Sequence, residues 1–133
     1  MPKYKLKPVT ALDNYQANIN GVKISEIVNI EIYSFAIKLN DEKKAASSMK
    51  RFFMCKMPSP GTVSIAKSSM TKIIRLSGDQ LFLLVNSKQV EMVTAHFEKF
   101  SKCFYITEQT DSWSGVNVSG LRVLECLERI CPI

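Results

Sequence analysis

The feature that most constrains the fold is a pair of apolar segments separated by a short polar turn. Residues 73–76 read Ile-Ile-Arg-Leu, residues 81–85 read Leu-Phe-Leu-Leu-Val, and Ser-Gly-Asp-Gln stands between them. An apolar–turn–apolar pattern of this length is typical of a β-hairpin. The two segments are aliphatic with one Phe, which indicates strands that contribute to a core. The sequence therefore predicts an antiparallel hairpin among the central strands of the fold.

Further strand and helix patterns stand on both sides of this hairpin. Residues 28–32 alternate apolar and polar side chains, as a half-buried strand does, but the apolar phase changes after Ser34. That strand is therefore expected to be either bulged or covered on both faces. Helical spacing follows in residues 41–53, 87–100 and 121–130, with further strands near residues 63–65, 104–107 and 116–118. This order predicts an α+β fold, a ferredoxin-like sandwich of antiparallel or mixed sheet with helices on one face.

The length of the chain, 133 residues, is that of one domain. Residues 1–27 are polar and mixed in character, and they include Pro2 and Pro8. We interpret residues 1–27 as an N-terminal arm that needs a surface to lie on, and residues 28–133 as a single α+β domain.

Residues that commonly carry catalysis are sparse. His96 is the one histidine, and Cys55, Cys103, Cys126 and Cys131 form no zinc or redox spacing. The cysteines are expected to be buried free thiols. The five glycines form no phosphate-binding loop, and the nearby carboxylates Glu108 and Asp111 are interpreted as solvated. We therefore predict no catalytic, cofactor-binding or metal-binding residue in this chain.

The formal net charge of +6 permits an anionic partner, but the lysines are spread along the chain, as a solubilising surface requires. Modules that bind RNA place stacking aromatic side chains on central strands, and the aliphatic strands here do not fit that pattern. RNA binding remains a third hypothesis. The N-terminus has no apolar signal region and no apolar run approaches membrane length, so we expect a cytoplasmic protein without a membrane partner.

Trp113 stands between two serines in a predicted turn. A tryptophan at such a place either folds back over the core or anchors a partner protein, where tryptophan is enriched among hot spots. We list Trp113, Asp111 and Arg75 as candidate partner contacts.

Three segments carry a resemblance to a known family. Residues 75–85 (RLSGDQLFLLV) and residues 107–120 (TEQTDSWSGVNVSG) are similar to a hairpin and a turn segment of the gamma subunit of heterotetrameric sarcosine oxidase. Residues 57–61 (MPSPG) precede the hairpin, as an apolar helix ending in Leu-Pro does in that family. The resemblance covers roughly residues 30–133. It implies part of the folate-binding aminomethyltransferase fold.

The resemblance also implies partners and cofactors. A gamma subunit assembles with alpha, beta and delta subunits that oxidise sarcosine to glycine, and those subunits hold FAD, FMN, NAD and tetrahydrofolate. The resemblance therefore implies a non-catalytic subunit that binds no cofactor itself. The chain ends at Ile133, earlier than the family pattern, and we expect the open sheet edge and the N-terminal arm to dock onto the larger subunits. The alternative is a free-standing protein that binds folate or another one-carbon carrier.

Overall fold

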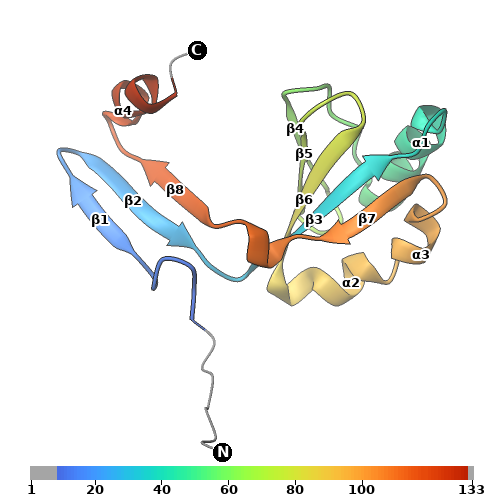
Figure 1. Ribbon diagram of the computed structural model, residues 1–133, viewed down its shortest axis with the longest axis horizontal. Coiled ribbons are helices and arrows are strands. Elements are labelled where there is room, and N and C mark those ends of the chain that lie inside the picture. Colours follow the sequence, from blue (N-terminus) through green and yellow to red (C-terminus); the bar gives the residue numbers. More distant parts are fainter. Residues whose placement is uncertain (1–8, 132–133) are drawn as a thin grey trace, which may run out of the picture. The chain divides into compact units, whose positions relative to one another are not determined.

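The computed structural model describes residues 9–131 and divides into two compact units (Figure 1). Unit 1 comprises residues 9–28 and 114–131, and unit 2 comprises residues 29–113. This division differs from the predicted arm over residues 1–27 and single domain over 28–133. Residues 16–27 form two strands, and the last segment of the chain is grouped with them; residues 1–8 of the predicted arm lie outside the described residues.

Unit 2 is built on a five-stranded antiparallel sheet with the strand order β4-β5-β6-β3-β7. Along the chain, β3, α1, β5, β6, the helical segment α2–α3 and β7 follow one another as β-α-β-β-α-β, the ferredoxin-like arrangement, and β4 is added at the edge beside β5. The predicted α+β class is confirmed. The elements are β3 (Ile30–Ile37), α1 (Glu42–Phe53), β4 (Val63–Ile65), β5 (Lys72–Arg75), β6 (Gln80–Asn86), η1 (Ser87–Gln89), α2 (Val90–Thr94), α3 (Phe97–Phe100) and β7 (Phe104–Glu108).

The predicted hairpin is β5–β6, which pairs in register from Lys72 with Leu84 to Arg75 with Leu81. Strand β3 lies between β6 and β7, and its register with β6 runs without interruption from Ile30 to Ala36. The change of apolar phase after Ser34 is therefore not a bulge. Strand β3 instead carries apolar side chains on both faces.

The core of unit 2 lies between one face of the sheet and its helices. Tyr33 and Phe35 of β3 point to the same side as the inward residues of β5 and β6, because strand residues alternate between faces. The helices contribute a stripe from α1 and the ring of Phe100 from α3. The fully buried side chains include Phe35, Ala45, Met49, Ile73, Leu81, Leu83, Val85 and Phe100.

Unit 1 is a three-stranded antiparallel sheet with the order β1-β2-β8, followed by α4. The turn between β1 and β2 is Asn20-Gly21, and both residues have positive φ, as a two-residue hairpin turn of the primed kind requires. The elements are β1 (Gln16–Ile19), β2 (Val22–Ile27), β8 (Gly115–Ser119) and α4 (Val123–Ile130). Among residues 9–131, no helix has the length and apolar character that crossing a membrane requires.

A close backbone approach explains the glycine that follows β8. Gly120 has a φ of +122°, and a Cβ atom at this position would lie 2.2 Å from the carbonyl oxygen of Gly21. Any side chain here would clash with the β1–β2 turn, and the backbone conformation itself favours glycine. Gly120 thus lets the chain pass over that turn before α4 begins.

The segment before β1 is held by one carboxylate. Glu26 accepts hydrogen bonds from the hydroxyl of Thr10 at 2.7 Å and from the backbone N–H groups of Leu12 and Asn14 at 2.9 and 2.8 Å. Desolvation acts to raise the pKa of Glu26, but the hydrogen bonds from Thr10, Leu12 and Asn14 outweigh it and hold the pKa below its ordinary value. The carboxylate form is therefore the one that orders residues 10–15.

This contact predicts a local dependence on pH. A depressed pKa contributes stability that is fully present above the ordinary value of 4.5 and is lost as the pH falls through the lower folded value. We expect hydrogen-exchange protection of the Leu12 and Asn14 amides to be constant from neutral pH to about pH 4.5 and to fall below it. Glu26→Gln should reduce this protection at neutral pH and remove its dependence on pH. Equal protection in the variant and the natural chain at pH 7 would contradict this role of Glu26.

Candidate functional site

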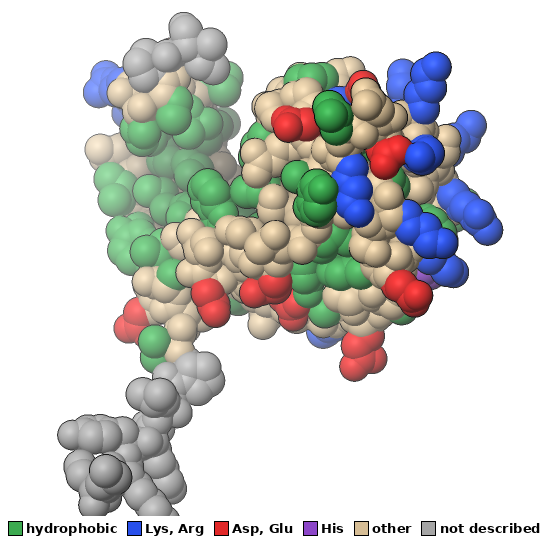
Figure 2. All heavy atoms as spheres, turned by 45° about the vertical axis from the view of Figure 1, so that its right-hand side comes forward, with side chains coloured by type: hydrophobic (Ala, Val, Ile, Leu, Met, Phe, Trp, Pro, Cys, Tyr) green, Lys and Arg blue, Asp and Glu red, His purple; other side chains and the backbone are tan. Residues whose placement is uncertain are grey.

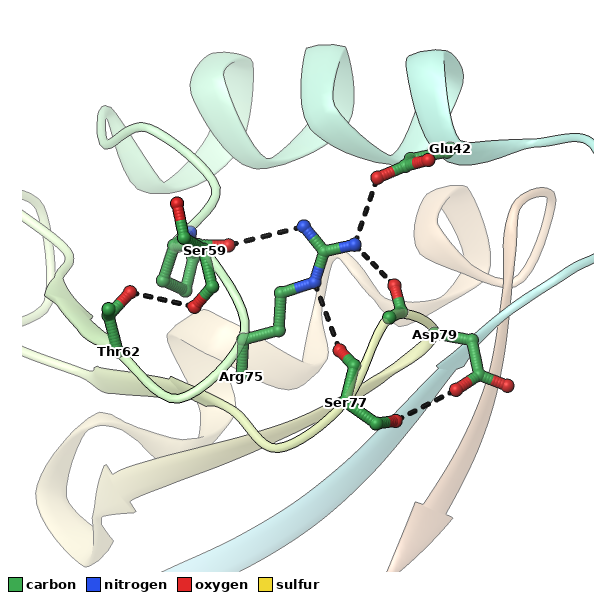
Figure 3. A network of polar contacts seen from close by, with 8 residues as sticks. Glu42, Ser59, Thr62, Arg75, Ser77 and Asp79 are labelled. Carbon is green, nitrogen blue, oxygen red and sulfur yellow. Dashed lines mark hydrogen bonds and ion pairs between the residues drawn. The ribbon is translucent and has the colours of Figure 1, made fainter.

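Arg75, one of the predicted contact residues, is almost completely buried, with 8% of its surface exposed. Its Nε donates to the carbonyl oxygen of Ser77 and its Nη1 to that of Pro58, both at 3.2 Å. Its Nη2 donates to Glu42 at 2.9 Å and also to the carbonyl oxygen of Gly78. Figure 3 shows the guanidinium lying between the start of α1, the segment after α1 and the β5–β6 turn.

This network joins three segments that are separate in the sequence. The β5–β6 turn is closed further by a hydrogen bond from the Ser77 hydroxyl to Asp79 at 2.8 Å (Figure 3). The bond to Pro58 is buried, where a carbonyl without a donor is costly. By also bonding to two carbonyl groups of the β5–β6 turn and to Glu42 of α1, the planar guanidinium holds all three segments together. The structure therefore gives Arg75 a structural role within unit 2 and leaves little of it for a partner to contact.

Trp113 and Asp111 lie in the segment after β7. Asp111 is exposed within the short helix η2 (Thr110–Ser112), and Trp113 follows it with 55% of its surface exposed. The Trp113 ring meets the ring of Phe82 edge to face, with a centroid distance of 5.4 Å. The Thr110 hydroxyl accepts from the backbone N–H of Ile32 at 3.1 Å, so the segment is anchored to β3. Trp113 thus rests partly on the sheet and keeps more than half of its surface free.

Phe82 belongs to the sheet face opposite the helices of unit 2, which we call the outer face. Alternation along the strands and the cross-strand register place nine apolar strand residues there, together with the uncharged polar residues Ser34, Gln80, Asn86 and Thr107. Val63 and Ile65 on the edge strand β4 are half exposed. Among the outward strand positions of residues 30–108, Lys72 is the one charged side chain. The apolar residues are Ile30, Ile32, Ala36, Val63, Ile65, Ile74, Phe82, Leu84 and Tyr105.

This composition is unusual for a sheet face without helices. An antiparallel sheet commonly alternates apolar residues toward the core with polar residues toward water. A face that is mainly apolar and carries one charged strand residue, beside an exposed tryptophan, resembles in composition the centre of a protein–protein interface. The change of apolar phase in β3 was the sequence signal for this second apolar face.

Comparison with solved structures gives a fold relation. The fold is similar to that of a chain of heterotetrameric sarcosine oxidase. That structure is the enzyme from Corynebacterium sp. U-96 in complex with pyrrole 2-carboxylate, and it matches with a TM-score of 0.67 at 14% sequence identity. The match covers 88% of this chain and 59% of the solved chain, so this chain spans less than two thirds of the length of its neighbour. No protein-family model and no curated protein matches the sequence.

His96 and Glu108 are titratable, and each contacts a neighbouring residue of the fold. The ring of His96 packs against Phe52 at a centroid distance of 4.9 Å. Hydrogen bonds from Thr110 hold the pKa of Glu108 below its ordinary value, so this carboxylate in its charged form accepts from the backbone N–H of Thr110, the first residue of η2. Within residues 9–131, no group of three or more His, Cys, Asp or Glu side chains is placed to hold a metal ion.

The cysteines differ in burial, which corrects the prediction that all four are buried. Cys103 is buried, Cys55 and Cys126 are half-buried, and Cys131 is exposed; all four are free thiols. Burial raises the pKa of the Cys55 thiol, which keeps it protonated and therefore a poor nucleophile. The prediction of buried thiols failed because helical spacing alone does not say whether a helix face meets a core.

One strongly perturbed group was not predicted from the sequence. The Tyr33 hydroxyl donates to Glu31 at 2.5 Å, and burial together with this carboxylate raises the pKa of the phenol. Tyr33 therefore stays protonated and serves as a hydrogen-bond donor within the core. The residues are two apart on one strand, and no sequence pattern marks such a pair.

Proposed function

We propose that this chain is a non-catalytic, gamma-type subunit of a sarcosine-oxidase-like complex. The observation that carries the proposal is the fold shared with a chain of heterotetrameric sarcosine oxidase over 88% of this sequence. In this proposal, oxidation of sarcosine to glycine takes place on the alpha, beta and delta subunits. Those subunits hold FAD, FMN, NAD and tetrahydrofolate, and this chain contributes a surface for assembly.

The outer face of unit 2 supports an assembly role. Most of its strand residues are apolar, Lys72 is the one charged residue among the outward strand positions, and Trp113 lies exposed beside Phe82. Interface centres are depleted of charge and enriched in aromatic side chains, as this face is. In the proposal, the outer face lies against a larger subunit and Trp113 is the anchor.

Native mass spectrometry of the affinity-tagged chain, purified from its source cells, tests the proposal. The expected result is recovery with two large flavin-bearing chains and one small chain. Recovery as a monomer or a homodimer contradicts the proposal. In that case, a saturable rise in melting temperature with tetrahydrofolate would favour the free-standing folate-binding alternative.

Substitution of Trp113, the proposed anchor, gives a second test of the assembly role. Trp113→Ala should weaken binding to the larger subunits by about 2 kcal/mol, which corresponds to about thirtyfold, because tryptophan hot spots contribute at this scale. Leu39→Ala is the matched control, since Leu39 is apolar and 90% exposed but follows β3 outside the outer face. Surface plasmon resonance with the purified larger subunits measures both variants. Equal affinities for the Trp113 variant and the natural chain would remove the outer face from the interface.

A further inference from the structure

A pocket of unit 2 lies between α1 and the segment that follows it. Its volume is about 880 Å³. It is lined by residues of α1, by residues 54–60 and by Arg75 of β5. Pockets for small molecules commonly span about 300 to 1,000 Å³. The space is therefore sufficient for a small organic molecule.

The charged residues that line this pocket are mainly cations. Lys50 on α1 and Lys56 after it are exposed, and Arg75 is buried. Glu42 is the one carboxylate among the lining residues, and it is already paired with Arg75 at 2.9 Å. Figure 2 shows lysine and arginine side chains extending from unit 2. The two lysines thus leave the pocket with a net positive charge that favours an anion.

Arg75 adds a directional donor to this charge. A guanidinium has five N–H groups, and the contacts of Arg75 use one on Nε, one on Nη1 and two on Nη2. The second N–H of Nη1 has no acceptor among the residues that the structure describes. Arg75 lines the pocket and is held rigidly by its other bonds, so a ligand acceptor that reaches this N–H would meet a pre-organised donor.

The rest of the lining is mainly apolar, with Ser47 and Ser59 as its polar members. Met54 is exposed at the rim, whereas Met57 and Pro58 are buried. Cys55 also lines the pocket, and its thiol is neutral because burial raises its pKa. Methionine side chains adapt to irregular apolar and aromatic shapes. The pocket therefore combines apolar lining residues with cationic ones.

We propose that this pocket binds a small organic anion, with an apolar body against Met54 and Met57 and one oxyanion head, a carboxylate or a phosphate, at Lys50, Lys56 and Arg75. The proposal does not depend on the assembly role, since the pocket residues are outside the outer face. The head group accepts from the free N–H of Arg75 and is neutralised by the two lysines. No covalent bond is made or broken.

Nuclear magnetic resonance of isotope-labelled methionine methyl groups in the full chain tests the proposal. The probes are naphthoate, naphthyl phosphate and the uncharged naphthalenemethanol. We expect naphthoate or naphthyl phosphate to shift the Met54 and Met57 signals saturably and to leave that of Met92, an exposed residue of α2, unchanged. The tighter of the two anions identifies the head group. Equal binding of naphthalenemethanol, or no shift of Met54 and Met57 with either anion, overturns the proposal.

Two exposed lysines supply the variants, so that folding is not at risk. Lys50→Gln combined with Lys56→Gln should weaken anion binding by about tenfold, since two ion pairs at a partly exposed site are lost. Lys102→Gln removes one exposed positive charge elsewhere in unit 2 and should change the affinity by less than about twofold. If Lys102→Gln lost as much affinity as the double variant, the anion would be attracted by the overall charge of the protein. That result too would overturn the proposal.

Discussion

Phe100→Ala should lower the free energy of unfolding of unit 2 by about 4 kcal/mol, the scale measured for removing a fully buried phenylalanine. Phe100 has no exposed surface, and its ring lies within 5.9 Å, centroid to centroid, of four other phenylalanine rings. Those rings come from the sheet and from α1, so the side chain of Phe100 packs against both layers of the core of unit 2. The neighbours are Phe35, Phe52, Phe53 and Phe104.

Urea denaturation measures this effect, with the fluorescence of Trp113, the one tryptophan, as the reporter for unit 2. Tyr105→Ala is the control, because Tyr105 is an exposed aromatic residue of β7. The control should change the stability by less than about 1 kcal/mol. A loss of less than about 1 kcal/mol in Phe100→Ala would show that the rings do not form one packed core.

Arg75→Met should destabilise unit 2 by about 3 kcal/mol. Methionine retains much of the aliphatic stem, but it leaves the carbonyl oxygens of Pro58, Ser77 and Gly78 without their donor. Hydrogen bonds to a charged group contribute about 1.5 to 3 kcal/mol each, and an unpaired buried carbonyl such as that of Pro58 costs about 1 to 3 kcal/mol. The ion pair adds little because Glu42 is 68% exposed. The turn between β5 and β6 should loosen first.

Two control variants separate the contributions to this effect. Lys72→Met removes a positive charge from the same strand on its outer face and should change the stability by less than about 0.5 kcal/mol. Glu42→Gln removes only the exposed ion pair and should cost less than about 1 kcal/mol. Thermal unfolding followed by circular dichroism compares the three variants. A similar cost for Glu42→Gln and Arg75→Met would assign the stability to the ion pair and contradict the role of the carbonyl groups.

The parts of the fold that depend on local patterns could be predicted from the sequence. The β5–β6 hairpin is encoded by two apolar runs and a four-residue turn, and α1 by its spaced apolar residues. The change of phase in β3 allowed two interpretations, and only the pairing with β6 decided between them. The resemblance to sarcosine oxidase agrees with the fold similarity to a chain of that enzyme.

Unit 1 could be predicted only in part: β8 and α4 were predicted from the sequence, but the β1–β2 hairpin and its pairing with β8 were not. Asn20-Gly21 is a strong signal for a two-residue hairpin turn, but the polar residues around it led us to interpret the segment as an arm. The pairing of β2 with β8 joins the two ends of the chain, and no local pattern encodes it. The same limit applies to Arg75, whose acceptors come from three segments, and to the pocket beside α1.

The most direct test of the assembly role is a spectroscopic one. The complex that co-purifies with this chain is given sarcosine without oxygen, and the visible absorbance of flavin is followed; the isolated chain is treated in parallel. The account predicts that the complex loses flavin absorbance on adding sarcosine, and that the isolated chain has neither flavin absorbance nor sarcosine turnover. Sarcosine oxidation by the isolated chain, or a complex without flavin, would contradict it.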